Sequence, residues 1–548
     1  METTMSSAAE QRQKIELYDT TLRDGTQGEG ISFSVEDKVN VAIRLDQFGI
    51  DFIEGGFPGS NPKDAEFFER IKDVQLIHAK VAAFGSTRRA HVAVEDDENL
   101  KALIRSGAKV ATIFGKSWTF HVTDALRTTL DENLRMIEES VAFLRFHGMD
   151  VIYDAEHFFD GYFADREYAL ETLEAAVRGG ASRVVLCDTN GGRLPHEVAE
   201  AVRAVRERIP AAIGIHTHND SGLAVANALA AVREGAVHVQ GTMNGYGERS
   251  GNCDLIQVIP NLQLKMGYAC VPAESMPKLT ELSRFVSELA NMRPDPRQPF
   301  VGKSVFAHKG GAHVSAILRH PETYEHIPPE AVGNQRRVLV SELSGGSNII
   351  YKAREYGVEL KKDSPVLRKV TETIKELEHQ GYHFEGAEAS FELLLKRELG
   401  LYRPFFELLG LRVTIDKRHP EDEPVVEATI KVRVGERVLH TAADGNGPVN
   451  ALDMALRKAL EEAYPEIRRI KLVDYKVRVL NERAGTGAKV RVLITQSDGK
   501  KSWGTVGVSA NIIEASWRAL ADGIEYGLIH VDATPMPLAQ SAEAGGSA

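Results

Sequence analysis

The chain has 548 residues, which is too long for a single hydrophobic core and predicts about two to four domains. Hydrophobic residues make up 43% and charged residues 26%, a composition that is typical of folded globular proteins and excludes long disordered stretches. The formal net charge of −12 disfavours nonspecific binding to nucleic acid or to anionic membranes.

Residues 1–14 form a polar tail that lacks the basic start and apolar middle of a signal peptide. No apolar run along the chain is long enough for a transmembrane helix. The three cysteines are odd in number and lack CxxC spacing, which indicates reduced thiols. We therefore expect a cytoplasmic protein with neither nucleic acid nor a membrane as a partner.

Residues 15–275 alternate between short apolar runs and segments with helical periodicity, and we expect this region to be the catalytic domain. Each run ends close to Gly, Asp, Glu or His. The eight runs cover residues 15–21, 50–56, 79–85, 109–115, 150–156, 183–189, 212–218 and 237–243.

Continuous apolar strands that alternate with helices predict a parallel sheet, because such strands are buried on both faces. Eight strand–helix units favour a (β/α)₈ TIM barrel over an open doubly wound sheet, and no GxGxxG motif follows the first strand. The fold class is thus α/β. In such a barrel the functional residues lie at the carboxyl ends of the strands.

Two histidines at the end of the seventh run predict a metal site. His216 and His218 are two residues apart, so in a strand both rings face the same side. Asp24 follows the first run and Asn252 follows the eighth. Since barrel closure makes strands one, seven and eight neighbours, we expect Asp24 to lie beside the histidines although 192 positions separate it from His216.

Two imidazoles, one carboxylate and one amide oxygen suit a divalent cation such as Mn²⁺, Mg²⁺ or Zn²⁺. Open coordination positions would accept a substrate with adjacent carboxylate and carbonyl oxygens, and the cation would polarise that carbonyl. Arg23 is next to Asp24 and is placed to stabilise the oxyanion that forms when the carbonyl is attacked.

Residues 276–405 read as helical connector subdomains that complete the active site, and residues 406–535 as a C-terminal α+β domain, before a flexible tail over 536–548. Within the C-terminal domain, strand-like and helix-like segments recur at an offset of 60 residues. This register aligns Val432 with Val492 and Gly447 with Gly507. The repeat predicts duplication of a strand-rich unit that ends in a helix, suited to pairing with a second subunit.

Three motifs resemble the signatures of the DRE-TIM metallolyase superfamily: DTTLRDGTQ (19–27), HTHND (216–220) and GYGERSGNCD (245–254). That superfamily includes the 2-isopropylmalate, homocitrate and citramalate synthases and the hydroxymethylglutaryl-CoA lyases. Segments 306–317 and 343–349 resemble the intermediate subdomain of the synthases. The resemblance implies the same barrel, the same metal set and acetyl-CoA as co-substrate.

Within the superfamily, residues 18–68 are most similar to the citramalate synthase branch. This implies condensation of acetyl-CoA with pyruvate and thioester hydrolysis to (R)-citramalate and CoA, a step toward isoleucine. A 2-isopropylmalate synthase that uses 2-oxoisovalerate is the alternative, followed by an acyl-CoA lyase or aldolase. A metabolite sensor without catalysis is a weaker alternative, because the whole metal set is present.

The resemblance also assigns roles to individual residues. Asp24, His216, His218 and Asn252 correspond to metal ligands, Arg23 and Gln27 contact the keto acid, and Thr189 binds its carboxylate. Glu156 corresponds to the catalytic glutamate, and His313 and Tyr324 to catalytic residues that reach the site from the partner subunit.

Several of these side chains also have a structural interpretation. Glu156 would serve equally in a salt bridge at the barrel rim, and His313 as a packing residue near a loop. For the pyruvate methyl group we expect an apolar pocket that involves Phe84, Phe114 and Tyr153.

The C-terminal region resembles the LeuA-type allosteric dimerisation domain, which implies a homodimer and feedback by a branched-chain amino acid. For a citramalate synthase the expected effector is isoleucine. Glycine turns open helices within residues 443–451 and 507–515 and would bind the amino-acid carboxylate. A purely structural dimer domain is the alternative.

Overall fold

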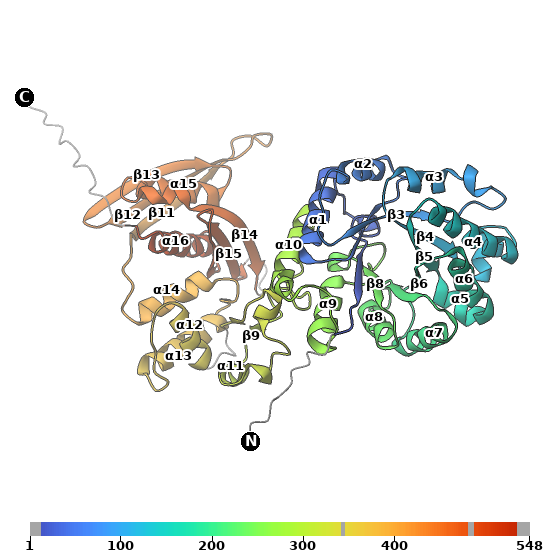
Figure 1. Cartoon of the computed structure of the whole chain (residues 1–548). Coiled ribbons are helices and arrows are strands. Elements are labelled where there is room, and N and C mark those ends of the chain that lie inside the picture. The colour runs from blue at the N-terminus through green and yellow to red at the C-terminus, as the bar shows by residue number, and fades with distance from the viewer. Residues whose placement is uncertain (1–11, 341–345, 481–486, 534–548) are drawn as a thin grey trace, which may run out of the picture. The chain divides into compact units, whose positions relative to one another are not determined.

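The computed structural model describes residues 12–340, 346–480 and 487–533 (Figure 1). The chain divides into two compact units. Unit 1 spans residues 1–306 and 327–335, and unit 2 spans residues 307–326 and 336–548. The domain boundaries expected from the sequence remain predictions.

Unit 1 contains a closed barrel of eight parallel strands in sequential order. The last strand pairs with the first, with Leu17 opposite Val239, which closes the ring. The eight-stranded TIM barrel predicted from the sequence is confirmed. The strands are β1 (Glu16–Asp19), β2 (Phe52–Gly56), β3 (Lys80–Ser86), β4 (Val110–Lys116), β5 (Asp150–Glu156), β6 (Arg183–Asp188), β7 (Ala212–Thr217) and β8 (His238–Gly241).

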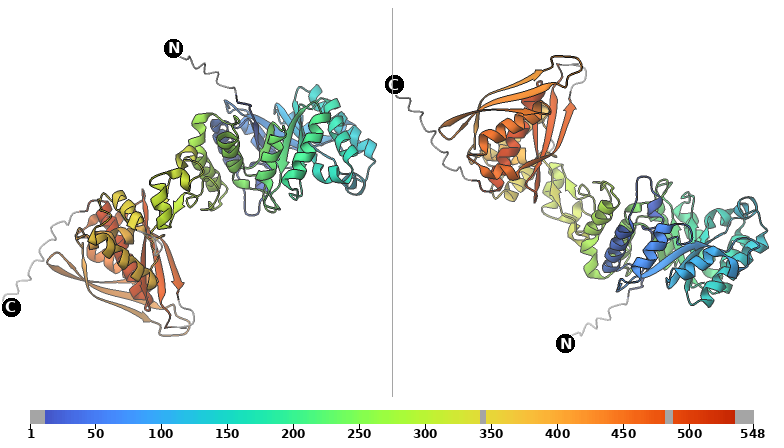
Figure 2. Two further views of the ribbon diagram at one scale, coloured as in Figure 1. Left: turned by 90° about the horizontal axis from the view of Figure 1, so that it is seen from below. Right: turned by 90° about the horizontal axis from the view of Figure 1, so that it is seen from above.

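Helices surround the barrel strands (Figures 1 and 2). They are α1 (Val35–Phe48), α2 (Pro62–Ile71), α3 (Glu98–Arg105), α4 (Leu130–Phe146), α5 (Phe158–Ala164), α6 (Arg166–Gly179), α7 (Pro195–Arg208), α8 (Ala224–Arg233), α9 (Leu255–Pro260) and α10 (Leu279–Leu289). Helix α1 shows how local sequence sets such bounds: Ser34 and Asp37 form a capping box at its start, and Gly49 ends it with φ 101°.

Alternate residues of each strand face the barrel interior or the helices. The interior carries an apolar cluster that contains Tyr18, Phe52, Ala82, Val110, Ile152, Val185 and Cys187. The neighbour of Ile152, Tyr153, belongs instead to the large cluster between strands and helices. The face of the strand on which a residue lies therefore decides whether its side chain points into the barrel or toward the helices.

Unit 2 begins with two short paired strands, β9 (Ala307–His308) and β10 (Arg337–Val338). Four helices follow or separate them: α11 (Gly311–Ile317), α12 (Gly346–Glu355), α13 (Pro365–His379) and α14 (Glu388–Glu398). The apolar faces of α12, α13 and α14 share a core that includes Ile349, Val370 and Phe391.

The rest of unit 2 repeats one arrangement twice: a three-stranded antiparallel sheet followed by a helix. The first copy is β11 (Glu407–Asp416), β12 (Val425–Val434), β13 (Arg437–Gly445) and α15 (Pro448–Leu460). The second is β14 (Lys471–Val479), β15 (Val490–Ser497), β16 (Ser502–Ser509) and α16 (Ile512–His530). Each helix packs on its own sheet and also contacts the other helix (Figure 2).

The register of the repeat differs from the offset of 60 residues expected from the sequence. The pairing of β11 with β12 shifts after Leu408, and that of β14 with β15 shifts after Leu472, 64 residues later. Gly447 precedes helix α15, whereas Gly507 lies within strand β16. The offset of 60 is therefore wrong, because it rested on matches between small residues at non-equivalent positions.

Among the described residues, no helix is both long enough and apolar enough to cross a membrane.

Candidate metal centre and active site

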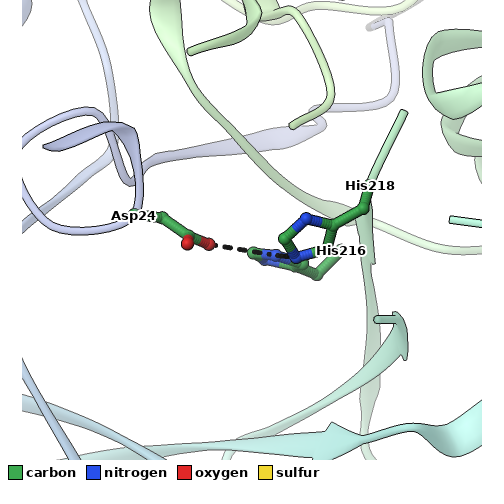
Figure 3. Close-up of side chains that lie close together, drawn as sticks. All are labelled: Asp24, His216 and His218. Atoms are coloured by element: carbon green, nitrogen blue, oxygen red, sulfur yellow. Dashed lines mark hydrogen bonds and ion pairs between the residues drawn. The ribbon is translucent and has the colours of Figure 1, made fainter. Parts of the chain in front are cut away.

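Asp24, His216 and His218 meet at the carboxyl end of the barrel (Figure 3). Strand β7 carries His216, and His218 follows the strand directly, so both rings point into the barrel mouth. Asp24 precedes the 3₁₀ turn Gly25–Gln27 after β1. One possible ligand atom from each residue lies within 4.8 Å of the other two, and all three side chains are buried.

The atoms that face one another in this cluster are one carboxylate oxygen and two ring nitrogens. His216 Nε2 lies 3.3 Å from Asp24 Oδ2 and 3.3 Å from His218 Nε2. Asn252 forms an isolated bridge with His218, and its Nδ2 lies 2.9 Å from Asp24 Oδ2. The structure thus brings together all four side chains that the sequence predicts as metal ligands.

Burial and neighbouring charges set the protonation of this cluster. Burial opposes ionisation of Asp24, but Arg23 and His216 outweigh it and hold the pKa of Asp24 well below its usual range. Burial, followed by the charge of His216, lowers the pKa of His218 to about 3. At neutral pH the site therefore offers an ionised carboxylate and a neutral imidazole, the forms that bind metals.

These residues fit a divalent cation. The buried Asn252 Oδ1 and His218 Nδ1 have no hydrogen-bond partner within the described chain. Since the oxygen and nitrogen of an amide are assigned from their surroundings, Asn252 is able to present either atom to the cluster. One carboxylate, two imidazoles and one amide oxygen are a ligand set suited to Mn²⁺, Mg²⁺ or Zn²⁺.

Arg23 connects the cluster to the barrel interior. Its Nε donates to Glu54 Oε1 at 2.6 Å, and its Nη1 lies 3.3 Å from Asp24 Oδ1. Tyr18 Oη donates to the other oxygen of Glu54 at 2.7 Å. The buried Glu54 carboxylate thus orients the guanidinium beside the metal cluster.

Aromatic side chains form the wall behind Arg23. The guanidinium carbon lies 3.7 Å from the centre of the Phe84 ring, and Phe84 stacks on Phe114 with ring centres 5.4 Å apart. Tyr153, also predicted to line the substrate pocket, faces the helices, where its hydroxyl lies against Gly115. That prediction is wrong, because Tyr153 is adjacent to the inward-facing Ile152 and strand residues alternate.

Glu156 ends strand β5, and its side chain forms an ion pair with Lys116 at the end of β4. This is the rim salt bridge considered from the sequence, and it keeps a carboxylate at the barrel mouth. Thr189 follows strand β6, and its Oγ1 accepts a hydrogen bond of 2.9 Å from the backbone N–H of His157. Gln27 is exposed at the rim.

His313 and Tyr324 lie in unit 2 and stack on each other with ring centres 4.2 Å apart. Tyr324 is 50% exposed, which leaves the pair accessible on the surface of that unit. Their predicted approach to an active site in a partner subunit stays a prediction.

Sequence reasoning missed three buried polar residues of the barrel: Glu54, Asp154 and Gln240. Gln240 Oε1 lies 2.8 Å from His216 Nδ1, and Gln240 Nε2 donates to Asp154 Oδ1 at 3.0 Å. Burial raises the pKa of Asp154 to about 7. Strand alternation would have identified Asp154, because it lies two residues after the inward-facing Ile152.

Three protein families match successive parts of the chain. Residues 14–286 match the HMGL-like family, residues 300–382 the homocitrate synthase post-HMGL domain-like family, and residues 385–528 the LeuA allosteric (dimerisation) domain. The barrel, the connector and the repeats each lie mainly within one of these matches.

Several relatives match the chain over nearly its whole length. The (R)-citramalate synthase of Geobacter sulfurreducens is 58% identical over 94% of this chain and 97% of its own length. That of Streptomyces coelicolor is 48% identical over 97% of this chain and its full length. The 2-isopropylmalate synthase of Methanocaldococcus jannaschii is 31% identical over 93% of this chain and 94% of its own length.

Proposed function

The chain belongs to the (R)-citramalate synthase family, and we propose that it condenses acetyl-CoA with pyruvate and hydrolyses the thioester to give (R)-citramalate and CoA. It is an acyltransferase, and its product leads toward isoleucine. The observation that carries the proposal is the buried group of Asp24, His216 and His218 with Arg23 beside it. Such a group suits a 2-oxo acid, whose carboxylate and carbonyl oxygens are adjacent.

Asp24, His216, His218 and Asn252 would hold the divalent cation, which supplies Lewis-acid polarisation of the keto-acid carbonyl when bound. Arg23 is oriented by Glu54 at 2.6 Å and stabilises the negative charge that develops on the attacked carbonyl oxygen. Gln27 contacts the keto acid, and Thr189 binds its carboxylate.

Glu156 removes a proton from the acetyl methyl group of acetyl-CoA. Its ion pair with Lys116 orients the carboxylate at the end of strand β5, from which it accepts that proton. The methyl carbon then forms a bond to the carbonyl carbon of pyruvate, and the resulting alkoxide takes up a proton. Water finally cleaves the thioester and releases CoA with a free thiol.

His313 and Tyr324 act from a second subunit, with His313 relaying the proton from Glu156. Their exposed position in unit 2 supports this role, because residues that serve a neighbouring copy must be accessible on their own. The dimerisation-type domain at residues 385–528 supports a homodimer as the functional state.

Pyruvate is preferred over the branched 2-oxoisovalerate because Phe84 and Phe114 close the wall beside Arg23. A hydrophobic pocket discriminates by only about 1–3 kcal/mol per methylene group, so the preference depends on this wall being tightly packed.

A thiol assay for CoA release tests the reaction directly. The full-length protein is incubated with acetyl-CoA and either pyruvate or 2-oxoisovalerate, after chelation and after adding back Mn²⁺, Mg²⁺ or Zn²⁺. We expect release with pyruvate that depends on the metal. Faster release with 2-oxoisovalerate would assign the chain to the isopropylmalate reaction, and release without a keto acid would indicate a hydrolase.

Isoleucine is the proposed effector, and unit 2 offers a site for it. A cavity of about 660 Å³ lies between α15 and β14. Val449, Ile470 and Leu472 form its apolar part. Asp453 and Arg457 are ion-paired with each other at 2.8 Å, and each keeps one buried atom without a hydrogen-bond partner in the described chain, Asp453 Oδ1 for an amino group and Arg457 Nη2 for a carboxylate. Isoleucine should lower the rate, and Leu472→Glu should remove this response without changing the uninhibited rate. An unaltered response in the variant would place the effector elsewhere.

A cytoplasmic location is part of the proposal. All three cysteines are unpaired and buried, which is typical of proteins from reducing compartments.

A further inference from the structure

We propose that Gln240, anchored by Asp154, fixes the ring of His216 with its metal-binding nitrogen facing the cluster. The inference rests on the metal site of the proposed function. It gives Gln240 and Asp154 a positioning role, in addition to the roles that the proposed reaction gives to other residues. Gln240 is 0% exposed and Asp154 is 4% exposed, so water has little access to either side chain.

The polarity of the Gln240 amide determines which nitrogen of His216 carries hydrogen. Gln240 Nε2 donates to Asp154 Oδ1 at 3.0 Å, and an amide NH₂ group is able only to donate. The amide oxygen is therefore directed at His216 Nδ1, at 2.8 Å. Because a carbonyl oxygen cannot donate, Nδ1 must carry the hydrogen of this bond.

A neutral imidazole with hydrogen on Nδ1 has its lone pair on Nε2. This is the atom that lies 3.3 Å from both Asp24 Oδ2 and His218 Nε2. The amide thus selects the one tautomer in which His216 presents a free lone pair to the metal cluster. It also holds the plane of the ring, because the hydrogen bond is made inside the barrel.

The barrel places these three residues together from three strands. Gln240 of β8 stands opposite His216 of β7 in the parallel register. Asp154 comes from β5, which does not neighbour β8 in the barrel, so its contact with Gln240 crosses the interior. Without Asp154 the amide would lose its buried acceptor and would be free to turn its NH₂ group toward His216.

Measuring metal affinity shows whether Gln240 positions His216 or only fills space in the barrel interior. The full-length apoprotein is titrated with Mn²⁺, and free Mn²⁺ is measured by electron paramagnetic resonance. Gln240→Leu keeps the approximate size of the side chain but removes the acceptor, and we expect Mn²⁺ to bind about 10–100-fold more weakly. Gln496→Leu makes the same change at a buried glutamine of unit 2 and should bind Mn²⁺ like the wild type.

A second pair of variants separates orientation from charge. Asp154→Asn removes the negative charge but keeps an oxygen that accepts from Gln240, so Mn²⁺ affinity should stay within about threefold of the wild type. Asp154→Leu removes charge and acceptor together, and we expect binding about 10-fold weaker. The visible absorption of bound Co²⁺ should change in Asp154→Leu and not in Asp154→Asn, because it reports ligand geometry.

Each outcome decides between explanations. Equal losses in Asp154→Asn and Asp154→Leu would show that charge, and not orientation, matters, and would overturn the inference. Wild-type affinity in Gln240→Leu would overturn it as well, and if that variant fails to fold, the Asp154 pair decides alone. Absence of Mn²⁺ binding by the wild type would instead refute the proposed metal site.

Discussion

In the barrel, Glu54, Asp154 and Gln240 are buried within hydrogen-bonding distance of other polar groups, whereas the two repeats of unit 2 bury mainly alanine, valine, leucine and isoleucine. The barrel residues come from strands far apart in the sequence. Each repeat instead pairs strands that follow one another along the chain and packs its own helix on them.

This contrast indicates where changes in the sequence are tolerated. A buried polar group is costly unless its partner is present, so each member of the barrel set depends on the others. An apolar helix face needs only volume and pattern. Accordingly, the two repeats share a plan while keeping few identical residues, among them the buried pair Leu456 and Leu520 at the offset of 64.

The largest effect should come from removing a predicted metal ligand. His218→Ala deletes one of the two ring nitrogens in the cluster, and we expect CoA release to fall on the order of 10³-fold or more. The exposed His419 of unit 2 provides the control: His419→Ala should leave the rate unchanged. Similar rates for both variants would mean that the barrel histidines do not serve catalysis.

Cavities made at equivalent positions of the two repeats should lower the free energy of unfolding by similar amounts. Leu456→Ala and Leu520→Ala each truncate a fully buried side chain, at a cost of about 2–5 kcal/mol in the free energy of unfolding. Urea unfolding followed by circular dichroism measures the cost, and Mn²⁺ titration checks that the barrel stays intact. A large loss at one position with none at the other would contradict the alignment at 64 residues.

Arg23→Lys tests how far the barrel depends on one side-chain shape. Lysine keeps the charge but is unable to contact Glu54 and Asp24 together while stacking on Phe84. We expect kcat/KM to fall about 10²-fold with metal affinity little changed. Arg412→Lys, at an exposed site of unit 2, is the matched control and should be silent.

The smallest effect concerns a buried acid of unit 2. Burial raises the pKa of Glu525 to about 7 from an ordinary value near 4.5, and its side chain accepts from Tyr402 Oη and from Phe405 N–H at 3.3 Å. Between these two values the unfolded chain releases the proton more readily than the folded one. The stability of this unit should therefore fall as pH rises from about 4.5 to above 7, by on the order of 2 kcal/mol.

Thermal unfolding between pH 4.5 and 8 measures this slope. Glu525→Gln is unable to titrate and should reduce the slope, although Asp522 of the same helix, whose pKa burial also raises, keeps part of it. Glu421→Gln, at an exposed position, should unfold with the wild-type dependence on pH. An unchanged slope in Glu525→Gln would show that its carboxyl does not titrate differently in the folded state.

Much of the barrel was predictable because its strands are continuous apolar runs that end in polar residues. The pairing of Asp24 with His216 followed from barrel closure alone. Gln240 and Glu54 were not predicted, because a single polar residue within an apolar run gives no sign of its partner. The assignment of Tyr153 failed since the direction of alternate side chains was not fixed from an inward-facing neighbour such as Ile152.

The sequence predicted that unit 2 contains a repeated unit of strands followed by a helix, but it did not predict the offset between the two copies. Identities between small residues such as Gly447 and Gly507 misled the alignment, because glycine occurs both before helices and within strands. The shifts after Leu408 and Leu472 give the correct offset, and these are properties of strand pairing that the sequence does not display.

The closure of β8 against β1 determines when a cation is first able to bind. Asp24 emerges early during synthesis, but Asn252 follows the last strand of the ring. A nascent chain that stops short of β8 lacks one of its four donors and the packing that holds the other three in place. We therefore expect cation binding to occur late, after the slow long-range pairing of strands is complete. The absorption or magnetic resonance signal of the bound cation would then report the last step of barrel folding.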